Sequence, residues 1–226
     1  DYNAPQTIGF LAYTEGVHDD VNKFIWSMRS WGTDNTAESI LTEYSRFFFA
    51  PQVANAAKDG ILALEDNWTK PALTNTGVDD TFTHWTELEE ANPDLEANWR
   101  WNLKLTRAYY DKFVREKVVD EAGYEEAALA LLRNAPTLGT GNAVNAARAE
   151  LDKADTLSAE QIERRNRIVA LCNTIWTQIG FQPSVDSPYL AKNPERGAIL
   201  DTLDHPANNR PFLENVFEQV AAMATE

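Results

Sequence analysis

The chain of 226 residues contains one cysteine, few basic residues and no long apolar run. The single cysteine, Cys172, excludes an internal disulfide and any zinc site built from several cysteines. It lies on the apolar side of a predicted helix, so we expect a buried structural thiol. No apolar run approaches the roughly 20 residues of a membrane span. The first residues, DYNAPQ, show neither an initiator Met nor a signal peptide, so we expect a mature product or a piece of a longer protein.

Basic charge is scarce, with 20 Lys and Arg against 35 Asp and Glu and a formal net charge of −15. Nucleic-acid binding requires a Lys and Arg footprint, and adsorption on an anionic membrane requires a basic surface. The charge therefore argues against both kinds of partner. Because acidic proteins repel other anions, we expect a neutral carbohydrate or another small neutral ligand rather than a phosphorylated one.

Hydrophobic residues make up 43% of the chain and aromatic residues 11%, which is typical of a folded domain. Apolar residues recur at helical spacing along most of the sequence, and caps and periods together predict about eight to ten helices. The longest predicted helix has no Gly or Pro from Leu95 to about Val119, is apolar on most sides and is expected to lie buried at the centre. A kink is expected at Gly123, before the helix continues from Ala127 to Arg133. We predict a mainly α-helical fold, an irregular multi-helix bundle with a short extended N-terminal segment.

Two capping boxes and one stop signal mark predicted helix ends. Asn35 to Glu38 has the form of a capping box with Asn as the cap, and Ser158 to Gln161 has the usual form. Gly180 is a typical C-terminal cap. The run from Thr69 to Gly77 and the run from Pro136 to Gly141 are predicted loops. Asn67-Trp68-Thr69 matches the glycosylation pattern, but it falls at a helix end and we interpret it as a chance match.

The N-terminal stretch contains the one convincing strand candidate, an apolar run from Ile8 to Tyr13 that ends at Glu15-Gly16. A lone strand cannot make a sheet, so its partners would lie outside this chain. A helix then follows from Asp19 or Asp20 to about Trp31. We therefore divide the chain into an extended segment over residues 1–18, which could be a last barrel strand with its loop, and an all-α domain over residues 19–226.

Ionisable residues gather where that strand candidate ends. Glu15 is the candidate catalytic residue, because glycosidic hydrolysis needs carboxyl groups of different protonation state beside the bond. His18 could donate a hydrogen bond to a hydroxyl group. The alternative is that Asp19 and Asp20 cap the helix and complement its dipole, with Glu15 an ordinary loop carboxylate. The candidate substrate-binding residues are Tyr13, His18, Asp19 and Trp26.

Metal and cofactor motifs are scarce. The other histidines, His84 and His205, are distant in sequence from His18, and no HExxH pattern is present. There is no glycine-rich phosphate loop and no GxSxG elbow. We therefore expect neither a metal nor a cofactor.

A resemblance adds to these observations. The run YTEGVHDDVNKFIWSMRSW, followed by an aromatic helix ending FFFAP, resembles the C-terminal part of large bacterial glycoside-hydrolase-like proteins. In such proteins, among them α-glucuronidase and some β-N-acetylhexosaminidase relatives, a (β/α)₈ barrel is followed by an all-α domain. The stretch NPERGAILDTLDHPANNRPFLENVF resembles the tail of the same kind of domain. The resemblance implies that residues 8–14 are the last barrel strand and that Glu15 lies at the catalytic rim.

Two functions are therefore expected. The first is a C-terminal helical module of a carbohydrate-active protein, which contributes to a sugar-binding or catalytic rim and has a catalytic barrel domain as partner. A chain of this length and composition cannot supply the barrel, so it would hold at most half of an active site. The second is a non-catalytic helical binding or scaffold protein with an exposed aromatic groove. A periplasmic or secreted location is favoured over a cytoplasmic one.

Overall fold

The structure is a computed structural model that describes residues 8–9, 11–13, 19–32, 34–192 and 198–223. Within these ranges the chain forms nine α-helices and no strand, which confirms the predicted mainly α-helical bundle. The α-helices are α1 (Asp19–Trp31), α2 (Ala37–Phe48), α3 (Ala54–Asp66), α4 (Gly77–Ala91), α5 (Trp99–Arg133), α6 (Ala135–Leu138), α7 (Thr140–Leu151), α8 (Ala159–Ile179) and α9 (Arg210–Met223). In the same described ranges, four 3-10 helices lie between them: η2 (Pro51–Val53), η3 (Pro93–Leu95), η4 (Asp152–Asp155) and η6 (Ile199–Thr202).

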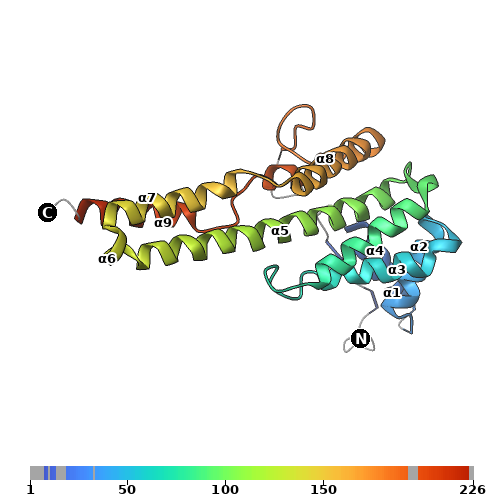
Figure 1. Cartoon of the computed structure of the whole chain (residues 1–226). Coiled ribbons are helices and arrows are strands. Elements are labelled where there is room, and N and C mark those ends of the chain that lie inside the picture. Colours follow the sequence, from blue (N-terminus) through green and yellow to red (C-terminus); the bar gives the residue numbers. More distant parts are fainter. Residues whose placement is uncertain (1–7, 10, 14–18, 33, 193–197, 224–226) are drawn as a thin grey trace.

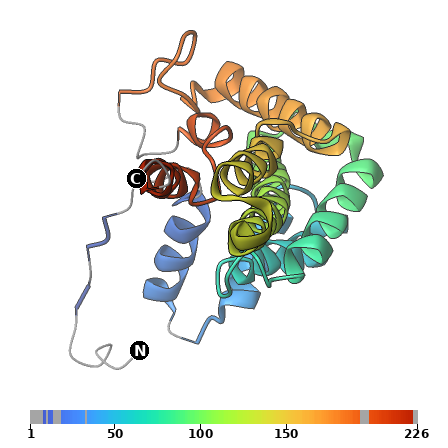
Figure 2. The same ribbon diagram turned by 60° about the vertical axis from the view of Figure 1, so that its left-hand side comes forward.

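Helix α5 is the central helix of the molecule, against which the other helices pack. Its 35 residues span about 50 Å at the usual rise of an α-helix. Helices α1 to α4 gather against its first half with α8 on another side, and α7 and α9 run along its second half (Figures 1 and 2). We call helices α1 to α4 and α8, with the first half of α5, the helical lobe. The second half of α5 with α6, α7 and α9 is the distal arm.

The core of the helical lobe combines aliphatic side chains with the buried rings of Tyr44, Trp85 and Trp101. The Trp85 and Trp101 rings are fully buried and meet edge to face with centroids 5.3 Å apart. Helices α3 and α4 approach closely because Gly60 has no side chain, and a Cβ there would lie 2.8 Å from the Trp85 ring. The indole Nε1 of Trp85 donates to the Gly60 carbonyl at 3.1 Å. A glycine on one helix and a large ring on the next therefore fix how α3 and α4 pack.

Two further apolar clusters lie along α5. One joins α5 to α8 and contains the buried thiol of Cys172, as predicted. Burial raises the pKa of that thiol to about 12, so it stays protonated at neutral pH. The other cluster forms the core of the distal arm and consists of Ala128, Val144, Ala147, Leu151, Leu213 and Phe217.

The structure corrects two predictions about the central helix. Helix α5 begins later than predicted, at Trp99, because Pro93–Leu95 forms a 3-10 turn and Asn98 caps the helix. The Asn98 side chain accepts hydrogen bonds from the backbone N–H groups of Arg100 and Trp101. The helix then passes through Gly123 without interruption, since helices α7 and α9 extend the packing beyond this position.

Other predicted boundaries also change. Thr36, not Asn35, caps α2, because Thr36 and Ser39 exchange side-chain and backbone hydrogen bonds of 3.1 Å. Asn35 instead donates to the Met28 carbonyl at the end of α1. The capping box at Ser158 and the left-handed cap at Gly180 are confirmed.

The prediction of a loop from Pro136 to Gly141 is wrong. A short helix, α6, occupies most of this run, and α7 begins at Thr140. Proline is tolerated in the first turn of a helix, where its missing N–H is not needed. Gly139 separates the two helices with a φ of 81°, a conformation that favours glycine. The turn is therefore a single residue long.

The strand predicted from Ile8 to Tyr13 is not formed by the described residues of that run. Ile8, Leu11 and Tyr13 are largely exposed and belong to no helix or sheet. A strand needs a hydrogen-bonded neighbour, and the described part of the chain offers no sheet edge.

Candidate ligand-binding pocket

The residues predicted to form a site lie at the start of the chain. Glu15 and His18 fall outside the described residues. Asp19 is the first residue of α1 and is half-buried, while Tyr13 and Trp26 are exposed. None of these three residues lines the pocket described below. The predicted site around Glu15 stays a prediction.

Asp20, next to the predicted site, has a structural role. Its carboxylate accepts a 2.6 Å hydrogen bond from the Tyr44 hydroxyl and two hydrogen bonds, 2.8 and 3.1 Å long, from Arg100. The Arg100 guanidinium lies between the Phe48 and Trp99 rings, 3.9 and 4.0 Å from their centroids. Burial opposes ionisation of Asp20, but the bonds from Arg100 and Tyr44 outweigh it and lower the pKa of this carboxyl. Asp20 thereby fastens α1 to α2 and α5.

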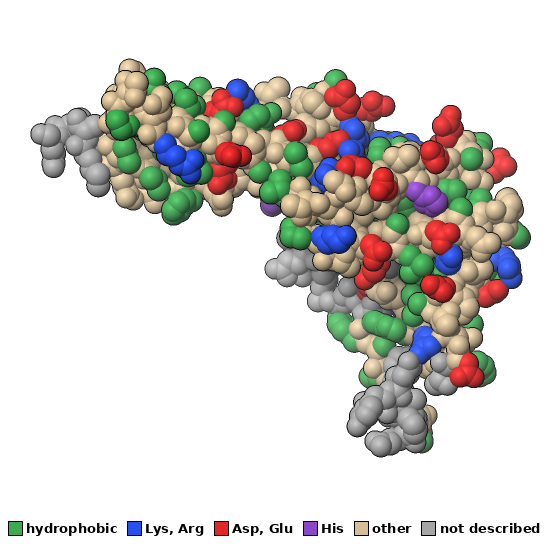
Figure 3. Space-filling view, turned by 60° about the horizontal axis from the view of Figure 1, so that its bottom comes forward, with side chains coloured by type: hydrophobic (Ala, Val, Ile, Leu, Met, Phe, Trp, Pro, Cys, Tyr) green, Lys and Arg blue, Asp and Glu red, His purple; other side chains and the backbone are tan. Residues whose placement is uncertain are grey.

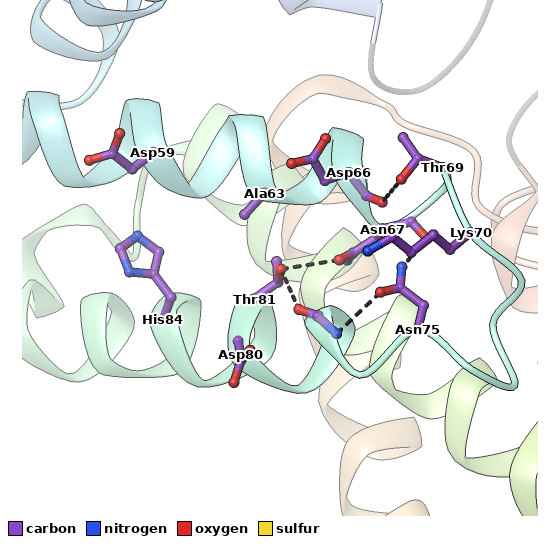
Figure 4. A pocket seen from close by; sticks show the side chains of 11 residues that line it. Asp59, Ala63, Asp66, Asn67, Thr69, Lys70, Asn75, Asp80, Thr81 and His84 are labelled. Carbon is purple, nitrogen blue, oxygen red and sulfur yellow. Dashed lines mark hydrogen bonds between the residues drawn. The ribbon is translucent and has the colours of Figure 1, made fainter.

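A pocket lies between α3 and α4, and the loop that joins these two helices closes one end of it (Figure 4). Its volume of about 670 Å³ is within the range of small-molecule sites. Side chains of Asp59 and His84 lie at one end and those of Thr69 and Lys70 at the other, with Asn67 and Thr81 between them. The lining residues are Asp59, Ala63, Asp66, Asn67, Thr69, Lys70, Asn75, Gly77, Asp80, Thr81 and His84.

A buried network fixes the floor of the pocket. Asn67 ends α3 and is 7% exposed, and its Nδ2 donates to Asp111 of α5 at 2.8 Å. The Thr81 hydroxyl of α4 lies 3.1 Å from Asn67 Oδ1, to which it can donate. Asn75 of the loop donates to the Asn67 carbonyl at 3.0 Å. Asn67 thus ties two helices and the loop to the central helix, and a glycan on its buried amide would break this network.

The network continues behind the floor to Arg107. Its Nε donates to the second oxygen of Asp111 at 2.8 Å. Burial raises the pKa of the Asp111 carboxyl, against the opposing effects of Arg107 and Asn67. Because both oxygens of Asp111 accept hydrogen bonds, the floor is held rigidly from behind.

His84 closes the other end of the pocket. Its Nε2 lies 2.8 Å from the Ala56 carbonyl, which can only accept a hydrogen bond, so Nε2 is the donor. The neutral ring then leaves Nδ1 as an acceptor. One imidazole nitrogen is therefore already engaged in joining α4 to α3.

The walls of the pocket are polar and acidic. Among the lining residues three are aspartates and one is a lysine, and the rest of the polar groups are amides, hydroxyls and His84. Acidic side chains are also spread over the face of the molecule in Figure 3. This balance repels anions and offers hydrogen-bond acceptors and donors to a neutral polar ligand or to a cation.

No group of three or more His, Cys, Asp or Glu in the described ranges is arranged to hold a metal ion. No helix among the described residues is both long enough and apolar enough to cross a membrane.

Comparison with known proteins returned no matching family model, curated protein sequence or solved structure. Sequence reasoning missed this pocket, although it singled out the run Asn67-Trp68-Thr69 as a glycosylation pattern. The informative signal was a cluster of polar residues at the end of the helix predicted before this run.

Proposed function

We propose that this chain is a non-catalytic helical module that binds a neutral carbohydrate in the pocket between α3 and α4. The observation that carries the proposal is the lining of that pocket, which combines carboxylate, amide and hydroxyl groups in a cavity of about 670 Å³. Sugars present many hydroxyl groups, each of which both donates and accepts a hydrogen bond. Carboxylate and amide side chains pair well with such groups, and the acidic walls disfavour phosphorylated ligands.

A binding role is favoured over catalysis by how the polar groups are engaged. The amides of Asn67 and Asn75 hold the floor together, and His84 uses Nε2 to join two helices. A nucleophile with a neighbouring base and a group that orients the base would support catalysis. The described lining residues present no such set.

The experiment is a calorimetric titration of the chain with glucose, xylose and N-acetylglucosamine. Asp66→Ala removes one pocket carboxylate, and Glu65→Ala is the matched control because its exposed carboxylate is adjacent in α3 but does not line the pocket. Loss of one or two hydrogen bonds to a charged acceptor predicts an affinity about 10-fold weaker for Asp66→Ala. Glu65→Ala should bind as the unmodified chain does.

Two results would contradict the proposal. One is that none of the three sugars binds the unmodified chain. The other is that Asp66→Ala and Glu65→Ala bind equally well. Glucose 6-phosphate provides a test of charge, because the acidic walls should make it bind more weakly than glucose.

The catalytic barrel partner implied by the sequence resemblance stays a prediction, as does a catalytic role for Glu15. Both are tested by the coding sequence upstream of this chain. A barrel-encoding stretch in the same reading frame would make the module part of a carbohydrate-active enzyme. A start codon directly upstream would leave a free-standing binding protein, which is the function that the second expectation described.

A further inference from the structure

Another cavity lies where the helical lobe meets the distal arm. Its volume of about 430 Å³ is within the range of small-molecule sites. Its walls come from the middle of α5, from η4 and from the segment that leads from η6 into α9. Four of the lining side chains are apolar, those of Ala154, Leu157, Pro206 and Pro211. The cavity therefore offers apolar surface as well as polar groups.

The two cations of this cavity are already engaged in the fold. Lys117 is 8% exposed, and its ammonium donates to the carbonyls of Leu203 and His205 at 3.0 and 2.7 Å. The Arg210 guanidinium donates to the two carboxylate oxygens of Asp155 at 3.0 and 2.9 Å. Both cations thus hold the walls of the cavity together.

Two buried polar atoms of the cavity, by contrast, have no hydrogen bond. Asn208 Oδ1 accepts from the backbone N–H of Arg210 at 2.9 Å, so the other terminal atom is the amide nitrogen. This nitrogen, Nδ2, is buried and has no partner among the described residues. Glu121 is 3% exposed, and its Oε2 accepts from the backbone N–H of Ala207 at 2.6 Å. Its Oε1 lies 3.7 Å from the Lys117 ammonium, which is too long for a hydrogen bond.

These two atoms indicate which chemistry fits the cavity. A buried amide donor without a partner destabilises a fold, so such groups are normally met by another polar group. Asn208 Nδ2 needs an acceptor, and Glu121 Oε1 needs a donor. Three carboxylates line the cavity against two cations, so a neutral ligand is favoured over an anion. A primary carboxamide carries an acceptor and donors on one uncharged, planar group.

We propose that this cavity binds a small neutral carboxamide with an apolar body. The carbonyl oxygen of the ligand accepts from Asn208 Nδ2, and its N–H group donates to Glu121 Oε1. The apolar body packs against the wall that includes Leu157 and Pro206. This site is separate from the pocket between α3 and α4, and it does not depend on the proposed function.

The test is a titration of the nitrogen-15-labelled chain with acetamide, benzamide and nicotinamide, followed by proton–nitrogen correlation NMR. The side-chain amide signal of Asn208 reports directly on Nδ2. This signal should shift and saturate with at least one of the three carboxamides. Benzoate has nearly the shape of benzamide but carries a negative charge, so it should bind more weakly than benzamide.

Asn208→Asp is the decisive variant. It keeps an acceptor for the backbone N–H of Arg210 and removes both donors of Nδ2, so carboxamide affinity should fall about 10-fold. A carboxylate near the start of α9 also complements the helix dipole, so the fold should be kept. Asn215→Asp is the matched control, because this exposed asparagine of α9 lies outside the cavity and should bind as the unmodified chain does. The backbone amide spectrum and circular dichroism check that each variant is folded.

Three results would overturn the carboxamide site. One is that no carboxamide shifts the Asn208 signal, which would mean that solvent alone meets this amide. Another is that Asn208→Asp and the unmodified chain bind carboxamides equally well. The third is that benzoate binds as tightly as benzamide, which would contradict a neutral ligand. None of these results bears on the sugar pocket, because Asp66 does not line this cavity.

Discussion

The helical lobe and the distal arm share α5 but are stabilised in different ways. Around the first half of α5 the core contains the buried rings of Tyr44, Trp85 and Trp101. Around the second half the core is built largely from Ala and Leu, with Phe217 as its one buried aromatic residue among those described. Aromatic side chains bury large areas, whereas alanine allows helix backbones to approach closely and buries little area per residue.

The two regions also differ in their polar groups. In the helical lobe, buried hydrogen bonds link Asn67, Thr81 and Asp111 beneath the pocket. In the distal arm, Lys117 and Glu121 form a buried pair near the start of the second half of α5, whereas contacts farther along the arm, such as the ion pair of Arg148 with Glu214, are partly exposed. Surface pairs contribute little stability, and buried networks fix geometry. The buried network thus gives the pocket of the helical lobe a rigid floor.

The largest expected effect comes from removing one aromatic residue from each region. Trp85→Ala and Phe217→Ala each delete a fully buried ring, and each should cost about 3–5 kcal/mol of local stability. We expect Trp85→Ala to lower the global free energy of unfolding and to abolish the pocket. Phe217→Ala should instead open α7 and α9 while leaving α3 and α4 protected, as measured by hydrogen exchange of the backbone amides.

The control for this comparison is Phe47→Ala, because this ring is 78% exposed and its loss should change neither region. Equal loss of amide protection in α3, α4, α7 and α9 for both core variants would show that the lobe and the arm unfold as one cooperative unit. Sugar titration of Phe217→Ala adds a second measurement, since an intact lobe should keep its affinity.

The sequence predicted the helices of both regions better than it predicted the pocket. Helix periodicity, the capping box at Ser158 and the cap at Gly180 predicted α8 and its ends. The cap of α2 was misplaced by one residue because Asn35 and Thr36 are both good caps, and only the side-chain contacts decide between them. The kink expected at Gly123 does not form, because a glycine inside a helix is tolerated when neighbouring helices pack along it.

The pocket was not predictable because it depends on tertiary contacts. In the sequence, Gly60 is only a residue of low helix propensity. Its contact with Trp85 shows that it sets the spacing of α3 and α4. Asn67 and Asp111 are 44 residues apart, so no local pattern links them. Helical spacing with Ile40 and Tyr44 predicts that Phe47 is buried, but Phe47 is 78% exposed at the end of α2. Burial of Cys172 was predicted correctly because it follows from one helix face alone.

A smaller effect, of opposite sign, is expected from Lys104 in the helical lobe. This lysine is 3% exposed, and burial lowers its pKa to about 8, while the nearby Asp20 carboxylate opposes the decrease. The unfolded chain holds this proton up to a pKa of 10.5, so the charged form is costly in the fold. Stability linked to Lys104 should therefore rise with pH between about 8 and 10.5.

Lys104→Met tests this expectation, because it keeps the apolar stem and removes the buried charge. The free energy of unfolding at pH 7 should increase by about 1–3 kcal/mol, and the difference from the unmodified chain should shrink as the pH approaches 10. Lys112→Met is the matched control on the same helix. Lys112 pairs with Asp79 and Glu116 at 2.7 and 3.0 Å, so its loss should destabilise the fold. Urea denaturation of both variants at several pH values provides the measurement.

The smallest expected effect lies where the lobe meets the segment that leads to the arm. Arg165 of α8 forms two hydrogen bonds with Asp204, 3.0 and 2.6 Å long, and Asp204 precedes α9 in the chain. These bonds lower the pKa of the Asp204 carboxyl, with burial opposing them. The Asp204 side chain is 64% exposed, so water and salt screen the pair. Arg165→Ala should cost only about 0.5 kcal/mol at pH 7.

The pH dependence of this pair follows from the lowered pKa. Its stabilisation is present above the pKa of Asp204 in the unfolded chain and is lost as pH falls through the lower pKa of the fold. Nuclear magnetic resonance titration of Asp204 should show its pKa move back toward 3.8 in Arg165→Ala. A loss above about 1.5 kcal/mol would exceed the usual range for exposed pairs. Such a loss would mean that the arm depends on its connection to α8, and that the lobe and the arm are more closely coupled than their separate cores indicate.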